Sequence, residues 1–385
     1  MLNKSHHLFP IKKDFAYLSH CSISPLYAPA RERAAEVLTA QSRRGILGVN
    51  EHSGVLDCLR THLASILQTD PDNCAFIKNT AEGMGMIANG FPFRAGEEVV
   101  SYVHEYPSNH YPWRLQEQRG VSLRLLPNRD MAKVNDTTLP CAWSLQDLKD
   151  LCTPWTRLVA VSHVQFSSGF AADLKHLGEF CAERGIDLVV DAAQSLGCLP
   201  VLPEQWNIAA VVASGWKWLL GPVGTGVMYT SPAFREKLGH VLTGAELMRQ
   251  DSDYLNHTWD PHGSARRFEY STSHVALAAS LATCLEQIHA HYGVHALKAE
   301  TLQLQDMILN GLNREKYIPL EFPDINRSGI LSVICKRRDP KDVQDMLQGQ
   351  GIIASARSGY LRLAPFFSNS KEEVEKAVSA LNELD

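Results

Sequence analysis

Three short runs of apolar residues, each long enough for one buried strand, constrain the fold of this chain more than any other feature. They are RLVAVSHV (157–164), IDLVVDA (186–192) and AAVVASG (209–215). Runs without polar alternation are typical of strands in a sheet that is covered on both faces. A helical segment, DLKHLGEFCAERG (173–185), separates the first two runs and ends at a glycine suited to a helix C-terminus. The pattern therefore predicts βαβ units and a mostly parallel sheet.

The alternation of strands and helices begins near Cys74 and ends near Gly293. Further strands are predicted at 75–79, 97–103 and 121–127, and helices at 80–89, at 109–118 and after the capping residue Ser144. Beyond Gly293 the pattern predicts helices at 295–312, 340–351 and 370–384, a strand at 329–338 and a hairpin around 357–364. We expect an N-terminal segment (1–50) that packs on the small domain and the cleft, a large α/β domain (51–293) and a small α+β domain (294–385).

The length and the net charge of the chain limit its number of structural units and the partners that it can bind. A chain of 385 residues is too long for one compact core, and its net charge of −5 offers no basic field for nucleic acid or anionic lipid. The nine cysteines are odd in number and show no C-x-x-C spacing, which argues for a reducing compartment. The first residues contain no apolar signal segment. We therefore expect a cytoplasmic protein without nucleic-acid or membrane partners.

The apolar stretch from Trp206 to Tyr229 has the length of a membrane-spanning helix. Four glycines and Pro222 interrupt it, and Lys217 would lie near the centre of the bilayer, where a charge is costly. A strand, a turn and a second strand fit better. The run GPVGTG (221–226) resembles a nucleotide-binding loop, but no lysine–serine pair follows it, so we interpret it as the turn into the strand GVMYT.

Lys217 is the only charged residue in this stretch. Burying an ammonium group costs free energy unless the charge is paired, exposed or used in chemistry. Lys217 follows the predicted strand 209–215, while Asp191 lies at the end of 186–192 and is followed by Gln194. Because ligands of open parallel sheets bind beyond the carboxyl ends of the strands, we expect these three side chains to meet there.

A helix N-terminus is predicted at the same edge of the sheet. Thr80 follows the strand 75–79 as the helix N-cap, and Ala81 and Gly83 leave the first N–H groups free for an anion. A buried carboxylate for a pyridinium nitrogen, a lysine that can condense with an aldehyde and a helix N-terminus for a phosphate are together the requirements of pyridoxal phosphate. Apolar surroundings favour the neutral amine that attacks an aldehyde.

The blocks DAAQSLGCLPV and SGWKWLLGPVGTGVMY, with 26 residues from Asp191 to Lys217, resemble the class V aminotransferase superfamily of fold-type I pyridoxal phosphate enzymes. The likeness extends from YLSHCSISP (17–25) to RLAPFFSNSKEEVEKAV (362–378). The superfamily includes cysteine desulfurases, selenocysteine lyases, cystine lyases, kynureninases and isopenicillin N epimerases. The resemblance implies a large domain with a mostly parallel sheet, a smaller α+β C-terminal domain, pyridoxal 5′-phosphate as the cofactor and an amino acid as the substrate.

The resemblance also assigns roles to single residues. It implies that Lys217 is the Schiff-base lysine, Asp191 the partner of the ring nitrogen and Gln194 the partner of the ring hydroxyl. The implied phosphate ligands are Thr80, Ala81 and Ser214.

Three further roles follow from the same resemblance. In EYPSN (105–109), Tyr106 resembles the aromatic residue that lies over the pyridine face in kynureninase-like members. In RFEYSTSH (267–274), Thr272 resembles a residue that reaches the phosphate of the neighbouring subunit, which implies a homodimer with shared active sites. Arg362 resembles the arginine that binds the substrate α-carboxylate, a task for which its planar fork suits it better than lysine.

The chain departs from the family pattern at three places. Trp216 precedes the lysine where histidine or tyrosine is common, and Phe166 stands where desulfurases carry an asparagine, for which Gln165 or Ser167 could substitute. The loop ASARSG (354–359) lacks the cysteine that serves desulfurases as the persulfide nucleophile. Two other cysteines could approach the cleft from outside that loop, Cys21 and Cys335.

A cluster of histidines, His289, His291 and His295, raises the question of a metal site. Only the last two would share a helix face, no carboxylate or cysteine completes the set, and Gly293 interrupts it. We therefore expect no metal.

The reaction is less constrained than the cofactor, because lyases, aminotransferases and epimerases on this scaffold all begin by removing the Cα proton. The missing loop cysteine favours β-elimination, in which the substituent on Cβ leaves without a protein nucleophile. An aminotransferase or an epimerase is the alternative. A non-catalytic binding protein is a third possibility, disfavoured because Lys217, Asp191, Gln194 and Arg362 are all present.

Overall fold

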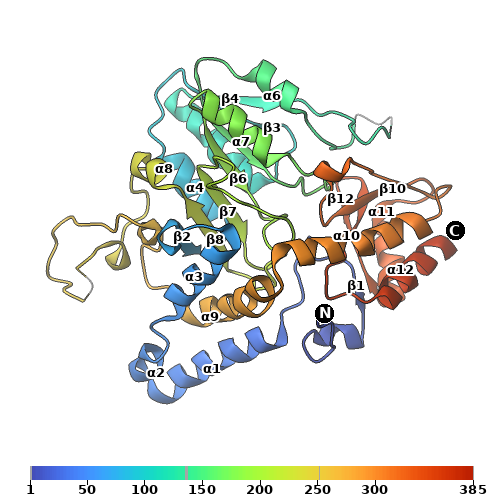
Figure 1. The fold of residues 1–385 in the computed structure, drawn as a ribbon, viewed down its shortest axis with the longest axis horizontal. Coiled ribbons are helices and arrows are strands. Elements are labelled where there is room, and N and C mark those ends of the chain that lie inside the picture. Colours follow the sequence, from blue (N-terminus) through green and yellow to red (C-terminus); the bar gives the residue numbers. More distant parts are fainter. Residues whose placement is uncertain (1, 135–137, 251, 385) are drawn as a thin grey trace.

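The computed structural model of the chain describes residues 2–134, 138–250 and 252–384, and a seven-stranded sheet forms the centre of its large domain (Figure 1). In the described part of the chain, β8 runs opposite to the other six strands of this sheet, which are parallel to one another, so the prediction of a mostly parallel α/β sheet is confirmed. In spatial order the strands are β2 (Cys74–Ile77), β8 (Gly226–Thr230), β7 (Ala210–Ser214), β6 (Asp187–Asp191), β5 (Thr156–Ser162), β3 (Glu98–Tyr102) and β4 (Ser122–Leu126).

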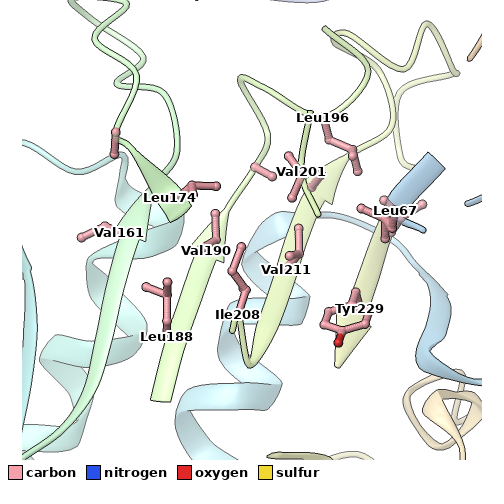
Figure 2. Close-up of a cluster of buried hydrophobic side chains, with 14 of the residues drawn as sticks. Leu67, Val161, Leu174, Leu188, Val190, Leu196, Val201, Ile208, Val211 and Tyr229 are labelled. Atoms are coloured by element: carbon pink, nitrogen blue, oxygen red, sulfur yellow. The ribbon is translucent and has the colours of Figure 1, made fainter. Parts of the chain in front are cut away.

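Both faces of this sheet are buried, which explains the continuous apolar runs. Leu188 and Val190 of β6 join one hydrophobic cluster, shown in Figure 2, whereas Val189 between them joins a second cluster on the opposite face. Side chains alternate between the faces of a strand, so a strand buried on both sides needs apolar residues at every position. The helices α3 (Val55–Leu67), α7 (Leu174–Glu183) and α9 (Val275–Cys284) contribute to the first cluster, and α4 (Thr80–Gly90), α5 (Tyr111–Leu115) and α8 (Pro232–Lys237) contribute to the second or lie beside it.

The helix predicted at 109–118 is broken into three pieces, and this prediction was wrong. A 3-10 turn over Pro107–Asn109 precedes α5, and a second one over Gln116–Arg119 follows it. Pro112 lies in the first turn of α5, where the missing N–H is tolerated, but it cannot lie inside a longer helix. Asn109 anchors the short helix by accepting a hydrogen bond from Nε1 of the buried Trp113 at 2.9 Å.

A second, four-stranded antiparallel sheet forms the small C-terminal unit. Its strands are β12 (Ser355–Arg357), β13 (Tyr360–Leu363), β10 (Leu331–Cys335) and β9 (Tyr317–Pro319), in this spatial order. Its helices are α10 (Val294–Gly311), α11 (Pro340–Gly349) and α12 (Lys371–Glu383). The remaining helices are α1 (Ala28–Arg44), α2 (Ile46–Asn50) and α6 (Leu145–Leu151), the last of which begins at Ser144 with the predicted cap. No helix among the described residues is both long and apolar enough to cross a bilayer.

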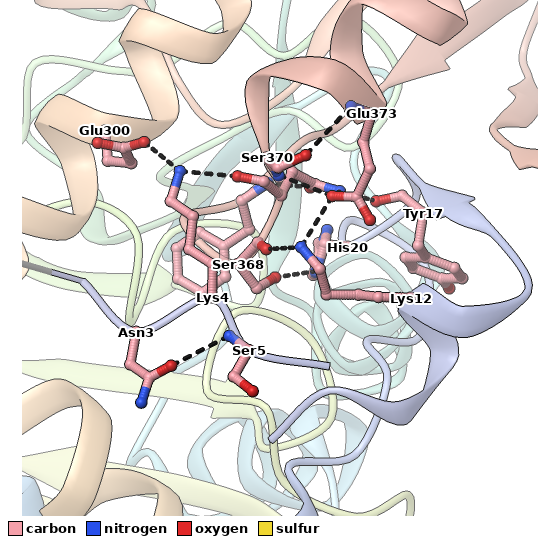
Figure 3. A network of polar contacts seen from close by, with 12 residues as sticks. Asn3, Lys4, Ser5, Lys12, Tyr17, His20, Glu300, Ser368, Ser370 and Glu373 are labelled. Carbon is pink, nitrogen blue, oxygen red and sulfur yellow. Dashed lines mark hydrogen bonds and ion pairs between the residues drawn. The ribbon is translucent and has the colours of Figure 1, made fainter. Parts of the chain in front are cut away.

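The N-terminal segment is tied to the small unit before it enters the large one. Strand β1 (Ala16–Tyr17) pairs in parallel with β11 (Ile352–Ile353). Lys12 donates to Glu373 at 2.9 Å, and Lys4 pairs with Glu300, in the polar network of Figure 3. The helix α1 then packs along α9 of the large domain. Residues between β1 and α1 therefore pass between the two units, where they reach the candidate site.

Candidate active site

A cavity of about 600 Å³ opens at the carboxyl ends of three neighbouring strands. Ser162, Asp191 and Ser214 are the last residues of β5, β6 and β7, and all three line it. This is the edge at which ligands bind in open α/β sheets. The side chains expected from the sequence that line the same cavity are Thr80, Ala81, Tyr106, Asp191, Gln194, Ser214, Lys217 and Arg362.

Lys217 extends into the cavity from the turn that follows β7. Its Nζ lies 5.6 Å from the centre of the Tyr106 ring. Protein surrounds the ammonium group on its other sides, and this burial lowers the pKa of Lys217, although the nearby Asp191 opposes the shift. Arg362 and Arg357 add to the lowering by repelling the positive charge. Together these effects shift Lys217 toward its neutral, nucleophilic amine form.

Asp191 is a buried carboxylate at the floor of the cavity, with 4% of the residue exposed. Its Oδ1 accepts a hydrogen bond from the backbone N–H of Ala193 at 2.9 Å. Burial raises the pKa of Asp191, while that N–H and the charge of Lys217 favour the ionised form. A carboxylate in this environment is stabilised by any cationic group that enters the cavity.

The amide of Gln194 is fixed from both ends. Its Nε2 donates to the backbone oxygen of Cys21 at 2.9 Å, and its Oε1 accepts from Nε1 of Trp218 at 3.2 Å. These contacts define which end of the amide is nitrogen, and they leave its second N–H for a ligand. Trp218 was not predicted as a site residue, because its neighbours in the sequence give no sign of a contact 24 positions away.

The helix α4 points its N-terminus at the cavity, but Asn79 and not Thr80 is its N-cap. Oδ1 of Asn79 accepts from the N–H of Glu82 at 2.9 Å, and Thr80 is the first helical residue. The capping role predicted for Thr80 was therefore wrong, whereas its place beside the cavity agrees with the prediction. Across from it, Oγ of the buried Ser214 has no hydrogen-bond partner among the described residues. Buried hydroxyls are normally paired, so Ser214 is suited to a bound anion.

Arg362 holds a charge that no described carboxylate neutralises. Its Nη1 donates to the backbone oxygen of Phe166 at 2.6 Å. Its Nη2 lies 3.2 Å from Oγ of Ser22 and 3.1 Å from Oγ of Ser355. The Nε atom is buried without a partner. Neutral acceptors thus orient the guanidinium group and leave its charge for an anionic ligand.

Thr272 is the one predicted site residue that lies elsewhere. It lines a small pocket of about 130 Å³ together with Lys78, Glu82 and Tyr270. Its segment is anchored by Glu269, which pairs with Arg60 at 2.5 Å. Thr272 is therefore absent from the cavity of its own chain.

The two departures near the lysine both line the cavity. The ring of Phe166 meets the ring of Tyr106 edge-on, with 5.3 Å between the centroids. The backbone oxygen of Trp216 accepts from the N–H of Ser24 at 2.8 Å, which ties the N-terminal segment to this wall. Phe166 therefore supports the aromatic side chain that we expected over the cofactor.

Sequence reasoning missed several lining residues that come from distant segments. Ser22 and Ile23 belong to the N-terminal segment, and Arg357 comes from the β12–β13 hairpin. Of the two cysteines considered earlier, Cys21 lines the cavity, whereas Cys335 lies in a separate pocket of the small unit. The block YLSHCSISP, which carries part of the family resemblance, was the available signal.

The histidine cluster does not form part of this cavity. His289 is buried in the π-helical turn Leu285–Ala290 and does not line the cavity. Within the described ranges, no group of three or more histidine, cysteine and carboxylate side chains is arranged to hold a metal ion.

The chain is similar to a known protein family, to named relatives and to solved structures. The family described as "Aminotransferase class-V" matches residues 27–373. A protein of Methanothermobacter thermautotrophicus named "Probable cysteine desulfurase" is 25% identical over 399 residues, covering 97% of this chain and 96% of the relative. The apo cysteine desulfurase of Thermococcus onnurineus superposes with a TM-score of 0.87 at 23% identity, covering 98% of this chain and 96% of that one. A cystine C–S lyase, solved with its reaction product cysteine persulfide, superposes with a TM-score of 0.88 at 19% identity, covering 98% and 99%. Both solved structures share the fold of this chain.

Proposed function

The chain belongs to the class V aminotransferase family of pyridoxal phosphate enzymes, and from this premise we propose that it is a lyase that eliminates a sulfur substituent from Cβ of an amino acid. The proposal concerns the reaction, since the family includes enzymes that treat the same kind of substrate differently. The choice of reaction depends on the side chains that line the cavity and on whether one of them is a mobile thiol.

The residues around the cavity fit the cofactor. Lys217 would hold it covalently, Asp191 would pair with its ring nitrogen and the free N–H of Gln194 would reach its ring hydroxyl. The hydroxyl of Ser214, which has no partner among the described residues, and the first residues of α4 line the same cavity, as a phosphate site requires. The remaining contacts would come from Thr80, Ala81 and the ring of Tyr106.

When bound, pyridoxal phosphate supplies a conjugated ring that accepts the electron pair left at Cα. Arg362 would bind the substrate carboxylate, because its guanidinium group is oriented and carries no counter-charge from the described residues. The neutral amine of Lys217 would take the Cα proton. Asp191 would keep the proton on the ring nitrogen, and its burial strengthens that pairing.

The observation that carries the proposal is the hairpin between β12 and β13. Ser358 and Gly359 alone connect the two strands, with φ of 51° and 84°, as in tight two-residue hairpin turns. A turn of this length has no room for a mobile loop that could carry a thiol to the substrate. The hairpin instead supplies Arg357 and Ser355, neither of which can accept sulfur.

Cys21 is the thiol that could replace such a loop cysteine. It is buried, and its Sγ lies 3.8 Å from Oγ of Ser355. Its backbone oxygen accepts a hydrogen bond from Gln194, and the N–H of Ser24, three residues later, donates to the backbone oxygen of Trp216. A thiol fixed in this way cannot follow sulfur as it leaves Cβ and then carry it to an acceptor, so we assign Cys21 to the wall of the substrate cavity.

The elimination balances without an external oxidant or reductant. The Cα–H and Cβ–S bonds break, the sulfur leaves as a thiol or persulfide with the electron pair of its bond, and water converts the remaining fragment into pyruvate and ammonia. Lys217 can return the proton to the departing sulfur. Sulfur-substituted amino acids such as cystine-type disulfides suit this route, because their sulfur is a good leaving group.

We further propose a homodimer in which Thr272 completes the site of the partner chain. The support is its position: the Thr272 pocket is separate from the cavity of its own chain. Tyr254, Leu255 and Trp259 are exposed on the segment that precedes it, and such apolar side chains are typical of interfaces. All nine cysteines are unpaired, which agrees with a reducing compartment such as the cytoplasm.

The experiment supplies sulfur-substituted amino acids and ordinary amino donors to the enzyme, each with and without a keto acid. A lyase forms pyruvate and ammonia from the sulfur compounds when no acceptor is present. An aminotransferase instead converts the bound cofactor to its amine form once per site and needs a keto acid to continue. That second result would refute the proposal.

A further inference from the structure

Glu105 is a buried carboxyl group directly behind the wall of the cavity. It follows β3, precedes Tyr106 and is 7% exposed. Its carboxylate accepts the backbone N–H of Ser162 at 2.7 Å, the hydroxyl of Ser162 and Nε2 of Gln165 at 3.2 Å. The proposed reaction uses none of these contacts.

The hydrogen bond between Glu105 and Gln165 connects the same two segments as the contact between the rings of Tyr106 and Phe166. Glu105 contacts Gln165, and the next residue in each segment forms the edge-on ring contact between Tyr106 and Phe166. The backbone oxygen of Phe166 in turn accepts the hydrogen bond from Arg362. Glu105 therefore fastens the loop that carries Tyr106 to the segment that orients the substrate-binding arginine.

No cation among the described residues pairs with Glu105. The charged group that acts on it is Asp191, which lies beside Ser162 in the register of β5 and β6. Tyr102, the last residue of β3, is a titratable neighbour. Burial raises the pKa of Glu105 to about 7, Asp191 raises it too, and the hydrogen bonds from Ser162 and Gln165 oppose the shift.

Gln165 offers a partner for either protonation state. The ionised carboxylate accepts from Nε2 of Gln165, while Oε1 of the same amide is buried and has no partner in the described part of the chain. A neutral Glu105 could donate its proton to that oxygen after the amide turns over. The pair can thus exist in two hydrogen-bonded arrangements that differ by one proton.

We propose that Glu105 is a positioning residue whose ionised form, clamped by Ser162 and Gln165, favours cofactor binding through Tyr106 and Asp191. The inference rests on the cofactor site proposed above and not on the elimination reaction. A protonated ring nitrogen beside Asp191 neutralises the charge that opposes ionisation of Glu105. By linkage, ionised Glu105 strengthens cofactor binding by the same factor, so affinity rises as the pH passes upward through the pKa of Glu105.

The first measurement uses the protein without cofactor. Infrared difference spectra recorded across the pH range should show a buried carboxylic acid that loses its proton near pH 7. The signal should be missing in Glu105→Gln, which keeps the size of the side chain, and present in Glu117→Gln, a control at an exposed carboxylate. Ser162→Ala removes a donor to the ionised form and should move the midpoint to higher pH.

The second measurement is the dissociation constant of pyridoxal phosphate at about pH 6 and about pH 8, where Glu105 is mostly neutral and mostly ionised. From the lower to the higher pH, affinity should increase about fivefold more in the wild type than in Glu105→Gln, which is the part of a one-unit pKa coupling that falls within this pH range. Equal pH dependence in a folded Glu105→Gln would overturn the proposal, and so would an infrared signal that titrates without a change in affinity. A protein that binds no pyridoxal phosphate at either pH would refute the cofactor site itself, and with it this role.

Discussion

Nζ of Lys217 lies 5.6 Å from the centre of the Tyr106 ring, although the two residues follow different strands and are far apart in the sequence. The sheet brings them together, because the loop after β3 and the turn after β7 both emerge at the carboxyl edge. An aromatic ring attached to that amine would have the Tyr106 face within stacking distance. This relationship links the lysine that we propose as the covalent anchor to the aromatic wall that we propose orients the ring.

Lys217→Ala should abolish covalent attachment of pyridoxal phosphate while leaving the fold intact, because the side chain lines a cavity. Borohydride reduction followed by peptide mass spectrometry measures the attachment. In the wild type the reduced adduct should map to Lys217. An adduct on another lysine at full occupancy would show that the assignment is wrong.

Trp218→Phe should weaken cofactor affinity about fivefold, the value of one hydrogen bond of about 1 kcal/mol, because Gln194 loses the donor that fixes its amide. Trp143→Phe is the matched control, since Trp143 is also buried but its indole N–H has no partner among the described residues. Fluorescence titration with pyridoxal phosphate measures both variants. Equal losses would mean that Trp218 acts through packing alone.

Hybrid dimers test whether Thr272 serves the site of the partner chain. A hybrid of Lys217→Ala and Thr272→Ala chains contains one site in which both residues are native if the sites are shared. Each homodimer should bind the cofactor poorly or not covalently, and each hybrid should regain one of its two sites. Sedimentation gives the oligomeric state. A fully active monomer, or no restoration in verified hybrids, would contradict shared sites.

Arg60→Ala should destabilise the protein by about 3–5 kcal/mol, because it leaves the buried Glu269 without its counter-charge. The segment that leads to Thr272 depends on Glu269, which also accepts the N–H of Phe76 at 2.8 Å. Arg44→Ala breaks a half-exposed pair with Glu51 and should cost less than about 1 kcal/mol. Urea unfolding compares the two. Similar midpoints would show that the buried pair has no structural role.

The sequence was sufficient to predict the positions of site residues that lie close to an apolar strand. Lys217, Asp191 and Gln194 could be placed beside one another because each closely follows an apolar strand, and parallel strands share one carboxyl edge. Two local predictions were wrong, because a neighbouring residue took the expected role or interrupted the element. Asn79 caps α4 in place of Thr80, and Pro112 prevents one continuous helix over 109–118.

Contacts between distant segments could not be predicted in this way. Cys21 reaches the cavity because the segment before it pairs with the small unit, where the N–H of His20 donates to the oxygen of Ala364 at 3.3 Å. The bond between Glu105 and Gln165 joins positions 60 residues apart. Neither contact can be recognised from hydrophobic periodicity or from the spacing of residues. Each depends on the order of the strands in the sheet and on the packing of the two units.

The ratio of pyruvate to alanine formed from a sulfur-substituted amino acid tests the proposed reaction most directly. Elimination gives pyruvate and ammonia, whereas transfer of sulfur to a protein thiol leaves alanine. The wild type and Cys21→Ser should both form pyruvate with little alanine, at rates within about threefold of each other, since we assign Cys21 to the wall of the cavity and not to the chemistry. Alanine as the main product of the wild type, lost in Cys21→Ser, would contradict the lyase and identify Cys21 as a sulfur acceptor.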